Sequence, residues 1–418
     1  MNRWLNAVAV LAFIVAPLSA QKSAPRPLAP GDIDDIAALL KLEDTRAFDE
    51  AELGRILKSA HPEVRRRAVM TLGRIVSEKA RPMLAALVDD KDPEILATVA
   101  WAMGQQKDPG AVAWLGRVLN DARTPAAIGK EAAQALGKIR SPEAHAALAT
   151  YLANAPLNAA ASVVGEALLS TGRFTTKEDI APILRWVKAS NAQVRWRAAW
   201  ALYRPRNPLA TPHLLAMTTD SSAEVRFWSM RGLNAAVVAQ SSVAPADASA
   251  RLRQALNDPD RRVRTEALST LGAFDATARL GYDDDATVAA ELKMLESSDT
   301  WLSVPAAQAL ARHTSRAAEI VPALLAASTP AKPRALRITV LPALVAMAPD
   351  AARALAASLA AEDNTTAKNA SAAATRQLDA AAARAAGAGQ AGAGRAGGAG
   401  RGAAQPPVYV ARPDAEYH

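Results

Sequence analysis

The chain has 418 residues, of which 50% are apolar but only 4% are aromatic, and alanine supplies much of the apolar content. A core of such small side chains favours close-packed helices over a β-sandwich or barrel, which would need more β-branched and aromatic residues. The absence of cysteine excludes disulfides, thiol catalysis and cysteine-ligated metal sites. The net charge of +8 is a thin excess of 49 basic over 41 acidic residues, too small to indicate nucleic-acid binding.

The N-terminus has the layout of a secretory signal peptide. A single positive charge at Arg3 precedes an apolar run, which ends in small residues at Ser19 and Ala20. The run is too short to span a membrane comfortably, so residues 1–20 are expected to be cleaved after Ala20 and not kept as an anchor. The mature chain would then be periplasmic or extracellular, with residues 21–31 as a short linker and no transmembrane segment.

Residues 32–350 repeat one pattern at intervals of 31 to 39 residues. In each unit an aliphatic or small residue is followed eight positions later by an aliphatic one, usually with a small residue midway. Positions i, i+4 and i+8 share one helix face, so each unit presents an apolar stripe that a neighbouring helix can approach closely. The stripes are Val64/Leu72, Ile95/Met103, Ile128/Leu136, Ala161/Leu169, Val194/Leu202, Val225/Leu233, Val263/Leu271, Leu302/Leu310 and Leu336/Leu344.

Each stripe marks the second helix of a helical hairpin, because another Leu-containing helical pattern precedes it. Stacked hairpins of this length predict an all-α fold, a right-handed α-solenoid of about nine hairpins with an armadillo-type superhelix. Residues 32–59 form a more polar pair suited to cap the array, and the longer intervals at 236–250 and 275–285 are loop insertions. A glycine after the last stripe residue, as at Gly73 and Gly104, predicts a C-terminal helix cap.

Three segments carry a family resemblance: HPEVRRRAVMTLGRI, NAQVRWRAAWALY and DPDRRVRTEALSTLG. They are similar to the second helix of HEAT repeats, in particular the HEAT-like repeats of phycobilisome lyases, and the resemblance covers about residues 60–350. It implies a scaffold or binding surface, because the family consists mainly of such proteins. The stripes at 161–169 and 302–310 lack the Val-Arg pair that begins the stripes at Val64, Val194, Val225 and Val263.

The C-terminal part changes character, since residues 351–404 are dominated by Ala and then by Ala and Gly. Few large apolar groups are available there to stabilise an ordered structure, so this stretch is expected to be a flexible linker, with helix as the alternative in its Ala-rich first half. Residues 405–418 regain Val, Tyr and Pro and are interpreted as the start of a further domain. The layout resembles secreted bacterial proteins that join a HEAT array to a cyclophilin-type peptidyl-prolyl isomerase.

The sequence offers no enzyme signature. Motifs of serine hydrolases, zinc proteases and P-loop proteins are absent, and the histidines are scattered. The acidic run at 283–285 lacks the other oxygen ligands that a calcium site needs. No catalytic residue, metal or cofactor is therefore expected.

An arginine follows the first stripe residue of several units, namely Arg65, Arg195, Arg226 and Arg264. Such a ladder resembles a row of phosphate-binding side chains. In HEAT-like repeats, however, the equivalent arginine bonds to acidic or carbonyl groups between neighbouring units, and this structural role is the one expected here.

A binding surface is expected from the positions six and two before the last stripe residue, which share a helix face beside the packed stripe. In a solenoid these positions form a ladder along the concave surface. Large rings and arginines concentrate there in two adjacent units, as in protein-binding hot spots. The alternative is that the rings pack between units as core. The predicted partner-binding residues are Arg66, Met70, Trp101, Lys130, Gln134, Trp196, Trp200, Phe227, Trp228 and Arg231.

Two functions remain open from the sequence. The first is an exported, non-catalytic HEAT-repeat scaffold that binds a protein or peptide on its concave face. The second is the non-catalytic N-terminal part of a secreted cyclophilin-type peptidyl-prolyl isomerase. A nucleic-acid partner is not expected, because export separates the chain from most nucleic acid.

Overall fold

The computed structural model describes residues 26–174, 179–275 and 285–391, and every regular element in these ranges is a helix. The predicted all-α fold is confirmed. The chain divides into two compact units, Met1–Gly232 (unit 1) and Leu233–His418 (unit 2). The expected signal peptide, most of the insertion at 275–285 and the segment 405–418 lie outside the described residues.

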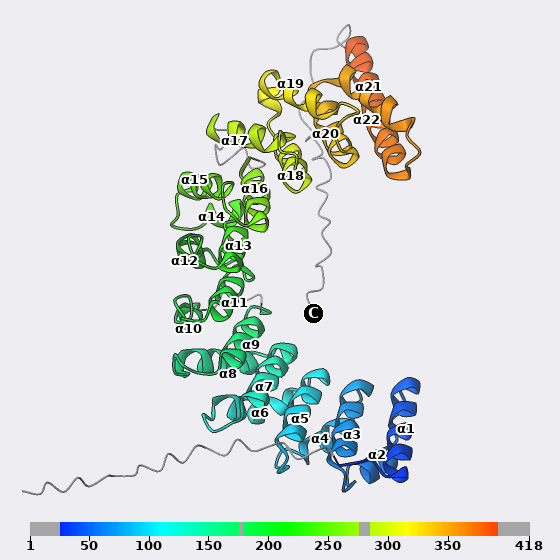
Figure 1. Ribbon diagram of the computed structural model, residues 1–418, viewed down its shortest axis with the longest axis vertical. Helices are drawn as coiled ribbons and strands as arrows, with labels where there is room; N and C mark the ends of the chain where they lie inside the picture. Colours follow the sequence, from blue (N-terminus) through cyan, green and yellow to red (C-terminus); the bar gives the residue numbers. More distant parts are fainter. Residues whose placement is uncertain (1–25, 175–178, 276–284, 392–418) are drawn as a thin grey trace, which may run out of the picture. The chain divides into compact units, whose positions relative to one another are not determined.

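Unit 1 is built from stacked helical hairpins (Figure 1). It opens with α1 (Pro30–Thr45), which packs against the second helix of the first hairpin. The second helices pack one against the next and lie along the inner side of the unit's arc (Figure 1). They are α3 (Pro62–Ile75), α5 (Pro93–Gln105), α7 (Ala126–Ile139), α9 (Ala161–Thr171), α11 (Ala192–Tyr203) and α13 (Ala223–Gly232). The first helices are α2 (Glu50–Ile56), α4 (Ala80–Ala85), α6 (Val112–Asn120), α8 (Pro142–Asn154), α10 (Ala181–Leu184) and α12 (Thr211–Met217), with short 3₁₀ turns η1 (Pro109–Ala111) and η2 (Pro208–Ala210) before α6 and α12.

Helix starts follow from capping chemistry. The Asp92 carboxylate accepts a hydrogen bond from the Glu94 N–H at 2.9 Å, and Pro93 occupies the first helical position of α5. His61 caps α3 in the same way through Nδ1, which accepts from the Glu63 N–H at 3.2 Å. These caps start α5 and α3 directly after the turn that ends the first helix of each hairpin.

The apolar stripes form the core, as Val64, Ala68 and Leu72 of α3 show by complete burial. The register of α9 differs from the expectation, because Val163 and Ala167, expected to face solvent, are buried while Leu169 is half-buried. This segment lacks the Val-Arg pair that marks the start of other stripes. Its small and aliphatic residues can form either of two apolar stripes along the helix, and packing in the structure buries the one that was not expected.

The glycines expected to cap the second helices have a different role. Gly104 lies within α5, and a Cβ atom there would come within 2.7 Å of the Ala135 Cα in α7. A Cβ atom on Gly137 of α7 would likewise come within 2.9 Å of the Ser170 Cα. These residues therefore allow close approach of successive second helices, and the left-handed cap after α3 falls on Val76. The other members of this row are Gly73, Gly172 and Gly272.

The arginine ladder is structural, as expected. Each guanidinium donates to the backbone carbonyl six residues earlier, and so provides a hydrogen-bond partner for a carbonyl in the turn before the helix. These carbonyl bonds lie within one hairpin, and Arg195 also donates to the Asp220 carboxylate of the next hairpin. The bonds are Arg65 to Ser59 (2.9 Å), Arg195 to Ala189 (2.8 Å), Arg226 to Asp220 (2.9 Å) and Arg264 to Asp258 (2.7 Å).

Unit 2 continues the same construction with three second helices, each packed against the next. The expected loop insertion at 236–250 contains a short helix, α14, and the start of α15. The elements are α14 (Ala235–Val238), α15 (Pro245–Ala255), α16 (Arg261–Asp275), α17 (Asp285–Leu295), α18 (Thr300–Leu310), η3 (Thr314–Arg316), α19 (Ala317–Ala327), α20 (Arg334–Met347), α21 (Pro349–Ala360) and α22 (Thr365–Ala391). Of these, α16, α18 and α20 are the second helices.

The prediction of a flexible linker at 351–404 is wrong for residues 351–391, because α21 and α22 form a further packed hairpin there. Leu355 and Leu359 of α21 and Leu378 of α22 are buried, and the Ser371 hydroxyl donates to the Ala356 carbonyl at 2.7 Å. Alanine is the strongest helix former and lets helix backbones come close. A few leucines are therefore enough to hold the hairpin on α20. Residues 392–404 lie outside the described residues.

Within the described ranges, we find no helix with the length and apolar character needed to cross a membrane.

Candidate binding surface

The ten predicted partner-binding residues all lie on the second helices of unit 1, on the side away from the packed stripes. Lys130 is exposed, and the other nine are half-buried. None of them is a fully buried core residue. This surface, from α3 to α13, is called the inner surface below.

Four rings from α11 and α13 form what we call the aromatic patch: Trp196, Tyr203, Phe227 and Trp228. The rings of Trp196 and Trp228 are nearly parallel, with centroids 6.4 Å apart. Phe227 meets Trp228 edge to face at 5.1 Å, and Tyr203 lies 6.1 Å from the same indole. Such contacts between neighbouring hairpins fix large rings in a half-exposed position.

The indole N–H groups of the patch are satisfied within their own helices. Trp196 donates to Gln193 and Trp228 donates to Glu224, both at 2.9 Å. The rings are therefore held by a polar anchor at one edge, while their apolar faces remain for packing and contact.

Arginines surround the aromatic patch. The Arg197 guanidinium lies 4.4 Å from the centre of the Trp196 ring, and the Arg231 guanidinium lies 5.7 Å from Tyr203 and 5.6 Å from Trp228. Cations at this distance over a ring are attracted by its electron-rich face. The patch thus combines apolar rings with fixed positive charge.

Trp200 does not make a ring contact with the patch. Its indole lies against Gly172 of the preceding hairpin, where a Cβ would come within 2.4 Å of the ring, and the Arg204 guanidinium lies 5.6 Å from the ring centre. Trp101 sits on Gly73 in the same way, with a corresponding distance of 2.5 Å. Both tryptophans therefore pack against the preceding hairpin and also form part of the inner surface.

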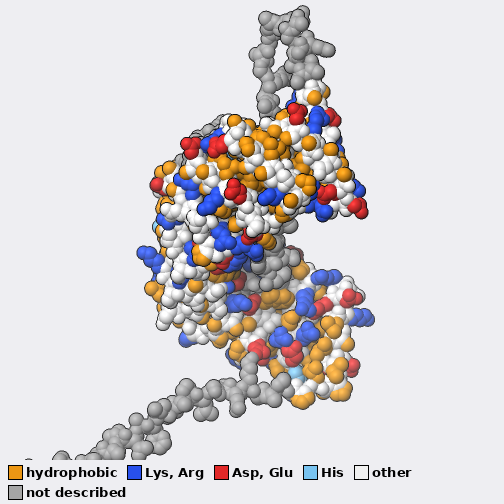
Figure 2. Space-filling view, turned by 45° about the horizontal axis from the view of Figure 1, so that its top comes forward, with side chains coloured by type: hydrophobic (Ala, Val, Ile, Leu, Met, Phe, Trp, Pro, Cys, Tyr) orange, Lys and Arg blue, Asp and Glu red, His pale blue; other side chains and the backbone are white. Residues whose placement is uncertain are grey.

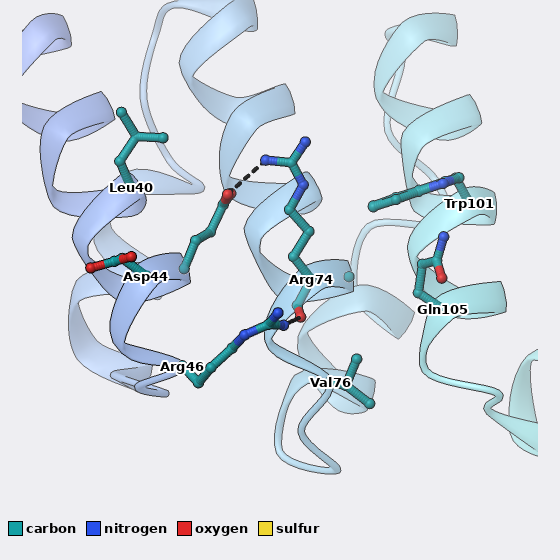
Figure 3. A pocket seen from close by; sticks show the side chains of 9 residues that line it. Leu40, Asp44, Arg46, Arg74, Val76, Trp101 and Gln105 are labelled. Carbon is teal, nitrogen blue, oxygen red and sulfur yellow. Dashed lines mark hydrogen bonds and ion pairs between the residues drawn. The ribbon is translucent and has the colours of Figure 1, made fainter. Parts of the chain in front are cut away.

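A pocket of about 630 Å³ opens beside Trp101, between the ends of α1, α3 and α5 (Figure 3). Leu40 and Trp101 point toward it from opposite sides, with the Arg74 side chain between them (Figure 3). Arg74 pairs with Glu43 at 2.6 Å. Val76 contributes an aliphatic side chain that is 58% exposed, from a left-handed backbone conformation with φ 53°. This conformation is unfavourable for a β-branched residue, and such strain is common at functional sites.

A smaller depression of about 260 Å³ also borders Trp101. The predicted residues Arg66 and Met70 line it, together with Trp101 and Glu131. Arg66 is held by Glu63 at 2.8 Å, so its charge is already balanced. Lys130 and Gln134 line neither space.

The middle of the inner surface is polar, with charges of both signs on α7 and α9. Burial raises the pKa of Glu131, against the opposing effect of Lys130, and burial lowers the pKa of Lys138. Glu166 is 9% exposed and lies 3.8 Å from Arg173. Among the described residues no group of His, Asp and Glu side chains is arranged to hold a metal ion.

The sequence patterns missed Tyr203 and most of the pocket beside Trp101. One signal was available. The predicted surface positions lie six and two residues before the last stripe residue, and the same helix face continues two residues after it, at Arg74, Gln105 and Arg204. The contributions of Leu40 and Val76 had no such signal, since one comes from the atypical N-terminal pair and the other from a helix end.

Comparison with known proteins matches the same region to HEAT repeats. The HEAT repeat family matches residues 50–127 and 160–234, and the PBS lyase HEAT-like repeat matches residues 130–154. The chain therefore contains HEAT repeats over most of residues 50–234, as the quoted segments at 61–75 and 191–203 indicated, whereas the third segment, at 258–272, lies outside these matches. No curated protein matches this chain at a significant level.

Solved structures with the same fold include two karyopherins. A mutant of Kap121p superposes with a TM-score of 0.59 at 12% identity, covering 86% of this chain and 46% of that one. Kap95p, from a study of its binding to RanGDP, gives a TM-score of 0.60 at 14% identity, covering 83% of this chain and 55% of that one. The chain spans about half the length of these karyopherins. At this identity the likeness shows the α-solenoid fold and nothing finer.

Proposed function

We propose that this chain is a non-catalytic scaffold that binds a protein partner, in an extended peptide-like form, along the inner surface of unit 1. The observation that carries the proposal is the aromatic patch, where four rings from two hairpins are held half-exposed beside arginines. Rings fixed in this way can bury area against a partner at little entropic cost.

The fold supports this function in general terms. HEAT solenoids present a long surface on which extended segments can lie. One solenoid of similar fold, Kap121p, is known bound to the extreme C-terminus of the protein phosphatase Cdc14p, and superposes on this chain with a TM-score of 0.57 at 11% identity.

Export is part of the proposal and rests on the layout of residues 1–20. The rival hypothesis, the N-terminal part of a cyclophilin-type isomerase, gains no support from the structure or the comparisons. The family matches end at residue 234, and the segment 405–418 lies outside the described residues.

The test compares capture by the wild type with capture by a Trp196→Ala, Phe227→Ala double variant. Purified chain is incubated with an extract of the encoding organism, and a protein that is retained is identified and then titrated in pure form. Loss of retention by the double variant, measured well below the melting temperature of both proteins, supports the proposal. Equal retention by both proteins, or no specific retention by either, contradicts it.

A further inference from the structure

Two arginines, one in α11 and one at its C-terminal cap, have no hydrogen bond to a carboxylate among the described residues. Arg197 donates to the backbone carbonyl and the side-chain oxygen of Gln193, at 2.8 and 3.2 Å. Arg204 is exposed, and its guanidinium lies 5.6 Å from the centre of the Trp200 ring. The other arginine of this helix, Arg195, is instead fully engaged by the Asp220 carboxylate at 2.7 and 2.9 Å.

Arg197 is also half-buried, so its charge is only partly solvated. Its side chain crosses Gly165 of α9, where a Cβ atom would come within 2.8 Å of the Arg197 Cδ, so the glycine makes room for the arginine. Burial lowers the pKa of Arg197, against the opposing effect of the more distant Glu166. A half-buried guanidinium without a bonded carboxylate gains more from an incoming anion than a solvated one.

Arg197 and Arg204 lie on one face of α11 with Trp200 between them. Seven residues of α-helix separate their Cα atoms by about 10 Å along the axis. An extended peptide in the polyproline II conformation repeats every three residues, or about 9 Å, so side chains three apart project from the same side. Two carboxylates at that spacing match the two arginines, and the intervening residues lie over Trp200 and the neighbouring aromatic patch.

We infer that α11 and the aromatic patch bind an acidic, proline-containing peptide segment, with two carboxylates three residues apart seated on Arg197 and Arg204. This deepens the proposed scaffold function and rests on it. It names the chemistry of the partner at the same surface.

A nucleic acid is the competing polyanion, and the surface fits it less well. The same row of helices carries Glu94, Glu131, Glu166 and Glu224, whose negative charges oppose a continuous phosphate backbone. Basic and acidic side chains are also interspersed over the face in view in Figure 2. A peptide with two discrete carboxylates avoids these repulsions.

The experiment titrates a proline-rich peptide with two Glu residues three positions apart, carrying a fluorescent dye, into the full chain and follows anisotropy. Three probes with the same dye serve as comparisons: the peptide with Gln at both positions, the peptide with its Glu residues adjacent, and a single-stranded oligonucleotide of similar length. The protein variants are Arg204→Glu and a matched charge reversal, Arg117→Glu, at an exposed position of α6.

We expect the Glu peptide to bind, the Gln peptide to bind at least about tenfold more weakly, and Arg204→Glu to weaken the Glu peptide by about tenfold or more. Arg117→Glu should leave binding unchanged, and the adjacent-Glu peptide should be weaker than the spaced one. Absence of binding, equal losses in both variants, indifference to Glu spacing, or tighter binding of the oligonucleotide would overturn the inference.

The inference and the scaffold proposal fail separately. A captured protein that is released by the double ring variant Trp196→Ala, Phe227→Ala, but retained in full by Arg204→Glu, would refute the acidic peptide and leave the scaffold standing. Indifference to both variants would refute both.

Discussion

Gly104 in α5 and Ala135 in α7 are in direct backbone contact, so that a Cβ atom on Gly104 would lie 2.7 Å from the Ala135 Cα. Gly104→Ala must therefore push two second helices apart, and we expect a loss of about 1–3 kcal/mol in the free energy of unfolding, measured by urea. The control is Gly54→Ala in α2, where the nearest atom is the Met83 Cε at 3.9 Å. That variant should be neutral or more stable by up to about 1 kcal/mol, since Ala is the better helix former. Equal effects would contradict the close-approach role.

A second prediction concerns the link between the α11 and α13 hairpins. The Asp220 carboxylate accepts two hydrogen bonds from Arg195 and one from the Ser222 N–H at 2.8 Å. Burial opposes ionisation of Asp220, but the bonds from Arg195 and Ser222 prevail and its pKa is lowered. Asp220→Asn should cost roughly 1.5–3 kcal/mol at neutral pH, since a charge-assisted pair is lost.

The sign of the pH dependence follows from that lowered pKa. The stabilisation by Asp220 is present above the pKa of an unfolded Asp, near 4, and is lost as the pH falls through the lower folded value. Urea unfolding should therefore separate wild type and Asp220→Asn at pH 7 and bring them together toward pH 2 to 3. A constant difference over that range would argue against the ionised pair.

The fold was predictable because the stripes depend on residue size and spacing alone. Val64 and Leu72 lie eight apart and are buried. At α9, where small and aliphatic residues fit two alternative stripes, only packing against α7 could decide which of them is buried. The glycines were misinterpreted as caps because a cap and a close approach select the same residue at a helix end.

The candidate surface was predictable in its positions and only partly in its contacts. Trp196 and Phe227 followed from a regular ladder, whereas the placement of Trp200 on Gly172 depends on the distance between two helix backbones. No spacing rule within one helix reports that distance. The pocket beside Trp101 likewise depends on how α1 packs on α3, which the repeat does not encode.

A third prediction tests the C-terminal hairpin that replaces the expected linker. Leu378 is 3% exposed, and Leu378→Ala should destabilise the packing of α22 by about 2–5 kcal/mol. Limited proteolysis should then cut within 349–391 faster than in the wild type. Gln377→Ala, at an exposed position beside it, is the control and should not change the cleavage rate. Equal rapid cleavage of the wild type in this range would favour a flexible linker.

A fourth prediction concerns export. Expressed in a Gram-negative host, the chain should be recovered from the periplasm or medium with Gln21 as its first residue, because the charge, apolar run and small residues of 1–20 match a cleaved signal. N-terminal sequencing provides the measurement. A variant with an Arg placed in the apolar run, Val10→Arg, should remain in the cytoplasm uncleaved. Recovery of the wild type with Met1 intact would refute export.

The last prediction separates a surface role of the aromatic patch from a core role, by comparing two tryptophans of unit 1. Trp186 is 1% exposed, and its Nε1–H donates to the Leu152 carbonyl at 3.0 Å. Trp186→Ala should therefore cost about 3–5 kcal/mol and leave that carbonyl unsatisfied.

Trp196 is half-buried and bonds only along its own helix, to Gln193. Trp196→Ala loses the ring contact with Trp228 and should cost roughly 0.5–1.5 kcal/mol. Urea unfolding of the two variants under one set of conditions gives both values. A loss for Trp196→Ala as large as that for Trp186→Ala would make the patch part of the core and remove the observation on which the scaffold proposal depends. A small loss keeps the rings available, because a ring that contributes little to folding can be retained for contact with a partner.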